Sequence, residues 1–398
     1  MYPDLSYFFH DLIGTDRDNW LSIFKTYGFF LLMAFIVAAQ LLRIELKRRE
    51  KMGQFTGITT LMQPGAGLST FDYIFNTLLG FALGYKLPYA IAKIDEWKGN
   101  PESVLLNSEG WLVTGLLGGL LFFGYYYWID RRSKQKMPEP MQIDIYPSDR
   151  IAPITFAAAI GGLVGAKVFA IIEYLPAFFE DPIGTFFSGS GLAIYGGLIG
   201  GFVTVYWYLH RYNIPKLPLM DAVAPALMIA YGIGRMGCQF SGDGDWGIIA
   251  AAQPEWWFFP DWLWAYDYPN NVVDGGGAAV EQIAGCTDRY CTRLAEGHYP
   301  TPVYETTAAF GIGWLLWSLR KKLAHLPGML FAVYLIFNGI ERFLIEYVRV
   351  NDQYDVLGLQ LTQAQLIAIG FVVSGAVMAT WVWNNRANSD SSPVQDPE

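Results

Sequence analysis

Nine apolar stretches of roughly 20 residues, separated by polar segments, dominate this 398-residue chain. A helix needs about 20 apolar residues to cross a bilayer. Within the hydrocarbon core, backbone groups must bond inside helices or closed barrels. Hydrophobic residues make up 53% of the chain and charged residues only 16%. The sequence therefore predicts an all-α, polytopic integral membrane helix bundle, with about nine spanning helices near 26–43, 71–93, 110–129, 151–173, 189–209, 221–240, 303–319, 327–348 and 364–384.

Lysines and arginines cluster in alternate loops, around 43–51, 131–136, 211–216 and 320–322. Because basic loops remain on the cytoplasmic side, this pattern puts the N-terminus outside and the C-terminus in the cytoplasm. Residues 1–25 lack the basic start and cleavage site of a signal peptide, and they predict an aromatic segment on the membrane surface. Residues 26–384 then form the transmembrane domain, and the polar tail 385–398 is predicted to be disordered.

The chain also contains an internal repeat. A gapless shift of 81 residues aligns the hairpin 71–129 with the next hairpin, matching glycines, a lysine and a loop proline: Gly80, Gly84, Lys86, Pro101 and Gly115 with Gly161, Gly165, Lys167, Pro182 and Gly196. In this alignment Thr114 stands where the second copy has Tyr195. The first hairpin is therefore predicted to be a duplicated structural support rather than a second site.

The predicted outer loop, residues 241–302, contains Cys286 and Cys291. Their spacing allows a disulfide in an oxidising compartment, although a chance pair would look the same. The net charge of −9 argues against nucleic acid as a partner. The four histidines show no ligand spacing, so we predict no metal and no cofactor.

A polar block, Gly234 to Gly247, follows a long apolar run and contains Arg235. A guanidinium at membrane depth is costly and is rarely left unpaired, so this arginine indicates an anion site. The predicted topology places further polar residues at the same outer depth: Tyr27, Tyr195, Glu305, Arg342 and Glu346. Each also has a plainer explanation, as an interfacial tyrosine, a helix-start glutamate or an i, i+4 ion pair. As a set, they favour a site for a phosphate-bearing lipid headgroup.

Four segments resemble the prolipoprotein diacylglyceryl transferase family: Gly234-Arg235-Met236-Gly237 with its continuation to Trp246-Gly247, Tyr195 to Gly201, Tyr304-Glu305, and Arg342 to Arg349. Their order and spacing match over about 151–384, and Tyr27-Gly28 matches the family's first helix. Other members carry histidine in place of Tyr195 and asparagine in place of Cys238. The family's glutamate after the signature is replaced here by Gly242 to Asp245.

The resemblance implies transfer of the diacylglyceryl group of phosphatidylglycerol to the lipobox cysteine of prolipoprotein signal peptides, with release of glycerol phosphate. It implies a bacterial inner (plasma) membrane location. It also implies phosphate binding by Arg235 and Arg342, with substrate contacts from Tyr27, Gly196, Gly197, Gly237, Gly247 and Glu305. The expected catalytic residues are Tyr195, Arg342, Glu346 and Asp243.

The identity of the base stays open at this stage. A phenol is a poor base unless a neighbouring arginine lowers its pKa, so Tyr195 is a candidate for orienting substrate while Glu346 or Asp243 takes the proton. Cys238 is expected to pack or to contact the headgroup, because direct displacement needs no covalent enzyme intermediate.

Two other classes of protein compete with a transferase. A small-solute transporter also has repeats and intramembrane charges, but its repeats usually cover half the chain and its charges lie near the midplane. A non-catalytic lipid-binding homologue would keep the fold and lose the arginines, whereas Arg235 and Arg342 are both present.

Overall fold

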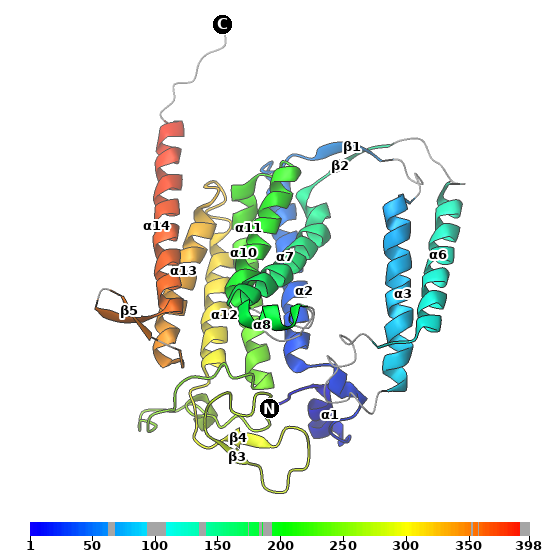
Figure 1. Ribbon diagram of the computed structural model, residues 1–398. Coiled ribbons are helices and arrows are strands. Elements are labelled where there is room, and N and C mark those ends of the chain that lie inside the picture. The colour runs from blue at the N-terminus through cyan, green and yellow to red at the C-terminus, as the bar shows by residue number, and fades with distance from the viewer. Residues whose placement is uncertain are drawn as a thin grey trace. The chain divides into compact units, whose positions relative to one another are not determined.

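The computed structural model describes residues 1–62, 68–93, 109–134, 141–173, 175–182, 185, 193–351, 353–356 and 358–390. Within these residues a helix lies at each of the nine expected places (Figure 1): α2 (Thr26–Lys51), α3 (Thr70–Ala92), α6 (Leu112–Lys134), α7 (Ile151–Glu173), α10 (Ile194–Arg211), α11 (Lys216–Ser241), α12 (Thr301–Leu319), α13 (Met329–Ile345) and α14 (Gln363–Asp390). Five segments are long and apolar enough to cross a membrane: 26–51, 112–132, 147–172, 216–241 and 363–385. The chain is thus a multi-pass helical membrane protein, while nine spans and their direction stay predictions.

The connections contain short strands that the sequence analysis did not anticipate. They form three antiparallel two-stranded sheets: β1 (Ile58–Met62) with β2 (Met141–Ile145), β3 (Val280–Gln282) with β4 (Thr292–Leu294), and β5 (Gln353–Val356) with β6 (Leu359–Thr362). The tail also differs from expectation. Helix α14 continues to Asp390, so residues 385–390 are helical rather than disordered, and 391–398 lie outside the described residues.

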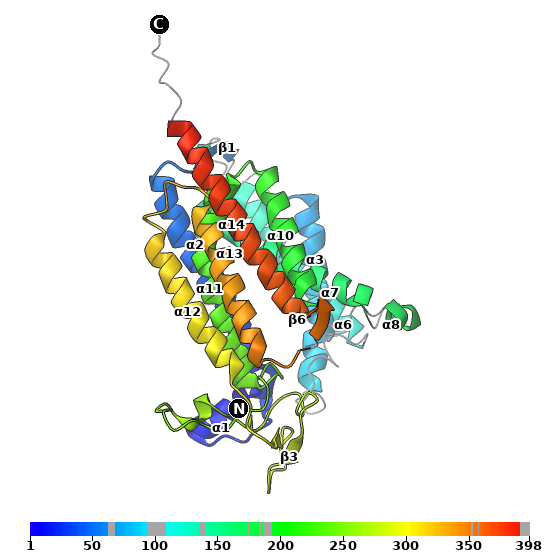
Figure 2. The same ribbon diagram turned by 90° about the vertical axis from the view of Figure 1, so that its left-hand side faces the viewer.

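The chain divides into two compact units, which we describe separately. Unit 1 comprises residues 1–55 and 209–398, and unit 2 comprises residues 56–208. In unit 1, α11 contacts α2, α12 and α13, and α13 also packs against α14 (Figure 2). Met228, Ala309, Leu316 and Leu330 form the buried centre of this packing. Helix α11 ends at Gly242, whose left-handed φ of 64° suits glycine.

The outer loop and the N-terminal segment fold against each other in unit 1. Trp246, Tyr268 and Leu294 give the loop a small core of its own, and a disulfide joins Cys286 to Cys291. The N-terminal segment forms α1 (Leu5–Ile13) and the short helix η1 (Trp20–Ile23). The Arg17 guanidinium donates to Asp288 at 3.0 Å, which connects this segment to the loop. The residues that follow α11 are therefore held by a folded cap.

A second set of charges lies where the basic end of α2 meets α11 and the connection after α12. We call it the Glu45 cluster, and it consists of Glu45, Arg48, Arg49, Asp221 and Arg320. Glu45 and Arg49 are fully buried and 2.9 Å apart. Asp221 accepts the backbone N–H groups of Gly328 and Phe331 at 2.8 and 2.9 Å, so a side chain of α11 caps the start of α13. Two loops that the sequence assigned to one side of the membrane are in contact here.

Unit 2 contains both copies of the repeated hairpin, α3 with α6 and α7 with α10. In the first, a Cβ added to Gly118 would lie 2.3 Å from the Gly80 carbonyl oxygen and 3.0 Å from Gly84. In the second, a Cβ added to Gly200 would lie 2.2 Å from the Gly161 carbonyl oxygen and 2.8 Å from Gly165. Glycines therefore let the two backbones touch in both hairpins, as small residues do in membrane helix pairs.

The contacts correct the gapless alignment. The first helices correspond at a shift of 81, but Gly118 corresponds to Gly200, a shift of 82. The connections agree, because Trp111 N–H donates to Tyr85 and Ala193 N–H donates to Ala166 at 3.0 and 3.1 Å. The second hairpin thus has one more residue between its helices, and the pairing of Thr114 with Tyr195 was wrong. Val113 is the counterpart of Tyr195.

Candidate functional site

Two arginines and two carboxylates form a closed ring of charges in unit 1. Arg235 lies near the end of α11. Its Nε is 2.6 Å from the Glu305 carboxylate of α12, and its guanidinium also forms an ion pair with Asp245. Arg349 completes the ring at 2.8 Å from Glu305 and 2.6 Å from Asp245. The Tyr231 hydroxyl donates to Glu305, and its ring lies 5.3 Å from the Arg235 guanidinium. Each carboxylate therefore bridges both arginines.

Arg342 and Glu346 extend this ring from α13. Their side chains form an ion pair at 3.0 Å, and Asn351 also donates to Glu346. The Nη1 atom of Arg342 is buried, makes no hydrogen bond to any residue that the structure describes, and lies 3.9 Å from Glu305. Arg342 is 24% exposed, compared with 0% for Glu305. We call these residues the Arg235 cluster: Arg235, Asp245, Glu305, Arg342, Glu346 and Arg349. Arg342 is the arginine with an unused buried donor.

The predicted contact residues of unit 1 surround this cluster. A Cβ added to Gly237 would lie 3.0 Å from Phe30 and 3.4 Å from the ring of Tyr27, so glycine permits α2 to approach α11 here. Gly247 donates its N–H to Tyr299 at 2.9 Å, and a Cβ there would lie 2.4 Å from the Val348 carbonyl oxygen. Gly247 thus holds the chain after Asp245 against the segment that carries Arg349.

The remaining predicted residues belong to unit 2. Gly196 and Gly197 lie in α10 and face α7: a Cβ on Gly196 would lie 2.3 Å from the Gly165 carbonyl oxygen. Helix packing alone accounts for glycine at position 196, and substrate contact by either residue stays a prediction. The backbone of Tyr195 is helical, but its side chain lies outside the described residues.

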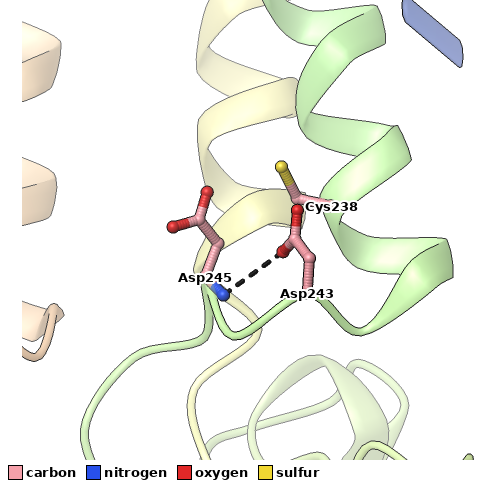
Figure 3. A group of neighbouring side chains, drawn as sticks. All are labelled: Cys238, Asp243 and Asp245. Carbon is pink, nitrogen blue, oxygen red and sulfur yellow. Dashed lines mark hydrogen bonds between the residues drawn. The ribbon is translucent and has the colours of Figure 1, made fainter. Parts of the chain in front are cut away.

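Cys238, Asp243 and Asp245 bring a thiol and two carboxylates together at the end of α11 (Figure 3). Their possible ligand atoms lie within 4.8 Å of one another, and the Asp245 N–H donates to Asp243 at 3.3 Å. A cation there would compete with Arg235 and Arg349, which already hold both oxygens of Asp245. This group is therefore poorly suited to a metal ion.

The two aspartates differ in acidity. Burial would raise the pKa of Asp245, but Arg235 and Arg349 outweigh burial and lower that pKa to about 2. Burial, followed by the charge of Asp245, raises the pKa of Asp243 above its ordinary value. Asp245 is therefore an anion near neutral pH and pairs with both arginines, whereas Asp243 takes up a proton more readily.

Sequence reasoning missed Arg349, Asp245 and Tyr231 as members of the site. A signal for Arg349 was present, because Arg342, Glu346 and Arg349 follow helical spacing along one face. Asp245 carried no such signal, because its pairing with Arg349 joins residues 104 positions apart.

Comparison with known proteins adds an independent observation. The sequence model of the prolipoprotein diacylglyceryl transferase family matches residues 113–381, about two thirds of the chain. This chain belongs to that family. It is 26% identical over 265 residues to the phosphatidylglycerol–prolipoprotein diacylglyceryl transferase of Clostridium tetani (strain Massachusetts / E88), covering 66% of this chain and 88% of that enzyme. It is 31% identical over 233 residues to the enzyme of the same name from Staphylococcus carnosus (strain TM300), covering 58% and 74%.

The diacylglyceryl transferase match includes all six residues of the Arg235 cluster. The matched range contains Arg235, Glu305, Arg342 and Arg349, whereas Tyr27 precedes it. It begins within α6, so helix α3 of the first hairpin lies outside it.

Proposed function

We propose that this chain is a phosphatidylglycerol–prolipoprotein diacylglyceryl transferase of the bacterial inner membrane. The reaction moves the diacylglyceryl group of phosphatidylglycerol to the lipobox cysteine of a prolipoprotein signal peptide. The observation that supports this most directly is the Arg235 cluster, where guanidinium groups converge beside a buried, unused donor of Arg342. The forked N–H groups of a guanidinium match phosphate oxygens in geometry, and the guanidinium of Arg235 lies at the end of a membrane helix.

The chemistry requires two kinds of assistance. The cysteine sulfur forms a bond to a glycerol carbon, while the bond from that carbon to the phosphate oxygen breaks and glycerol phosphate leaves with the electron pair. Negative charge grows on the phosphate, and Arg235 and Arg342 are placed to stabilise it. Arg349 also forms ion pairs with Asp245 and Glu305. The two carboxylates therefore share their negative charge between Arg235 and Arg349, and they orient Arg235 without fully neutralising it.

The thiol must also lose its proton, because the thiolate is the nucleophile. Asp243 is our candidate for the acceptor, since burial and the charge of Asp245 raise its pKa, and no arginine of the described residues forms an ion pair with its carboxylate. Glu346 is paired with Arg342 and Asn351, which makes it a weaker candidate. Tyr195 keeps its predicted role of orienting substrate.

The extracytoplasmic side is the expected location of the site. A disulfide lies in the outer loop that caps the cluster, and disulfides persist in oxidising compartments. On this proposal the cluster lies at the outer leaflet, where a translocated signal peptide would present its cysteine.

A purified-protein assay tests the proposal. The protein is reconstituted in phosphatidylglycerol bilayers with a synthetic signal peptide containing a lipobox cysteine, and thioether-linked peptide and glycerol phosphate are measured. Both products should form in equal amounts, and none should form with a cysteine-to-serine peptide or with phosphatidylethanolamine alone. Glycerol phosphate release without lipidated peptide would contradict a transferase.

A further inference from the structure

A cleft lies between α12 and α13 beside the Arg235 cluster. Its volume is about 320 Å³, and residues at helical spacing line it: Tyr304, Ala308 and Ile312 from α12, with Phe337, Glu341 and Leu344 among those from α13. The lining runs from Phe337 to Ile345 along α13, roughly 12 Å at 1.5 Å per residue. Apart from the Glu341 carboxyl and the Tyr304 hydroxyl, which donates to Leu263, the side chains that line it are apolar.

Glu341 is the unexpected residue in this lining. It is only 8% exposed, and neither carboxyl oxygen has a hydrogen-bond partner among the described residues. An unpaired carboxylate is costly in apolar surroundings, and a carboxylic acid also needs an acceptor for its O–H. Arg342, the next residue, forms its ion pair with Glu346, and none of the described residues, Arg342 included, hydrogen-bonds to the Glu341 carboxyl. The cleft is therefore incomplete without a ligand that hydrogen-bonds to Glu341.

The position of Glu341 restricts what that ligand is. Glu341 adjoins Arg342 in sequence, and Tyr304 in the same lining adjoins Glu305. A glycerophospholipid with its phosphate at the arginines would present its ester carbonyls next and its acyl chains after them. The carbonyls of an apolar peptide helix are already bonded within the helix, so they offer few free acceptors.

We infer that the α12–α13 cleft holds an acyl chain of the diacylglyceryl donor, and that the neutral Glu341 side chain donates a hydrogen bond to an ester carbonyl of that lipid. This inference rests on the proposed transferase function and adds a specificity residue to it. Glu341 is a positioning residue, because it contacts the donor away from the bond that breaks.

Diester and diether phosphatidylglycerol distinguish this role, because the ether lacks the carbonyl. In reconstituted protein, kcat/KM with the diester should exceed that with the diether by about three- to tenfold, the range of one neutral hydrogen bond. Glu341→Gln keeps a donor and should keep this ratio, whereas Glu341→Leu should bring it close to one. Glu281→Leu, the same substitution in the exposed strand β3, should leave the ratio unchanged.

A second variant tests the cleft without altering Glu341. Ala308→Phe should fill it and raise KM for long-chain phosphatidylglycerol several-fold more than for a short-chain form. This measurement also serves if Glu341→Leu fails to fold.

Several results would overturn the inference. One is an unchanged diester-to-diether ratio in Glu341→Leu. Another is loss of turnover on both lipids in Glu341→Gln, which would indicate that Glu341 transfers a proton. The third is an Ala308→Phe variant in which only the KM for the peptide rises. A wild-type protein that lipidates no peptide with either lipid would instead refute the proposed function, so the two failures are distinguishable.

Discussion

The Arg235 cluster and the Glu45 cluster contain the same kinds of side chain in unit 1 but differ in their surroundings. In the Glu45 cluster, Arg49 and Glu45 are fully buried, and Asp221 caps the start of α13. In the Arg235 cluster, Arg342 is partly exposed and has an unused donor, beside an apolar cleft. Charged side chains inside a membrane protein are therefore not evidence of function in themselves. Buried donors without a hydrogen-bond partner among the described residues also occur in the Glu45 cluster, at Arg49 Nη2 and Arg320 Nε, so the better indicator is an unpaired donor beside a cleft that can take a ligand.

The largest expected effect on turnover is at Arg235. Arg235→Ala should lower turnover per folded molecule about a thousandfold, because it removes stabilisation of charge growing on the phosphate. Arg235→Lys should recover only part, since an ammonium cannot make the forked contact. The measurement is lipidated peptide per folded, detergent-extracted protein, with Arg342→Ala and Arg342→Lys in parallel. Wild-type turnover in both alanine variants would remove the phosphate-binding role from this cluster.

A smaller loss is expected at Asp243. Asp243→Asn should lower turnover about a hundredfold, within the range of a general base. The raised pKa of Asp243 means that wild-type activity should fall as pH drops through a value above the ordinary one, about 3.9 for aspartate, because the carboxylate becomes protonated. That acid limb should be absent from Asp243→Asn. If the fall in activity at low pH persists in Asp243→Asn and disappears in Glu346→Gln, Glu346 rather than Asp243 is the general base.

Arg49→Ala should affect folding rather than chemistry. Removing one partner of a buried ion pair costs about 3–5 kcal/mol, and the lower end of this range is expected here, because Asp221 loses its arginine whereas Glu45 keeps Arg48 and Arg320. The yield and melting temperature of the extracted protein should fall, while turnover per folded molecule stays near wild type. A normal yield with reduced turnover would mean that the two clusters do not differ in the way described.

The smallest effect is a pH dependence of stability from Asp245. Its pKa is lowered to about 2 in the folded protein, so its contribution is complete above about pH 4 and is lost as pH falls towards 2. The melting temperature of wild type should exceed that of Asp245→Asn at neutral pH, and the gap should narrow over this window. A gap that is constant from pH 7 to 2 would show that Asp245 is not held by the arginines.

The sequence predicted the elements better than their contacts. Apolar runs predicted a helix at each of nine places, because bilayer thickness imposes a length that composition reveals. Polar helix ends were not predicted: α2 continues past 43 to Lys51, and α14 continues past 384 to Asp390. Helix α11 shows the limit, since it begins at Lys216 rather than near 221 and contains Pro225. The short sheets were missed, because strands of three to five residues in polar connections leave a weak pattern.

The site was predicted in part for a similar reason. Arg235, Glu305, Arg342 and Glu346 could be grouped by depth, and the structure brings these four together. The roles of Asp245 and Arg349 depend on a contact between distant segments, which depth does not specify. Glu341 also carried a signal in the sequence, because an acidic residue within an apolar helix is unusual. It was overlooked because it stands next to Arg342.

The glycine-lined hairpins have a consequence for the direction of the rest of the chain. In α3 and α6 the contacts run from Gly80 with Gly118 to Gly84 with Thr114, so the two helices are antiparallel. With both helices crossing the membrane as predicted, a duplicated pair of this kind would return the chain to the side from which it left. Adding or deleting such a pair would therefore preserve the direction of every later helix, including α11 and α13, which carry Arg235 and Arg342. An insertion of one helix would have reversed them all.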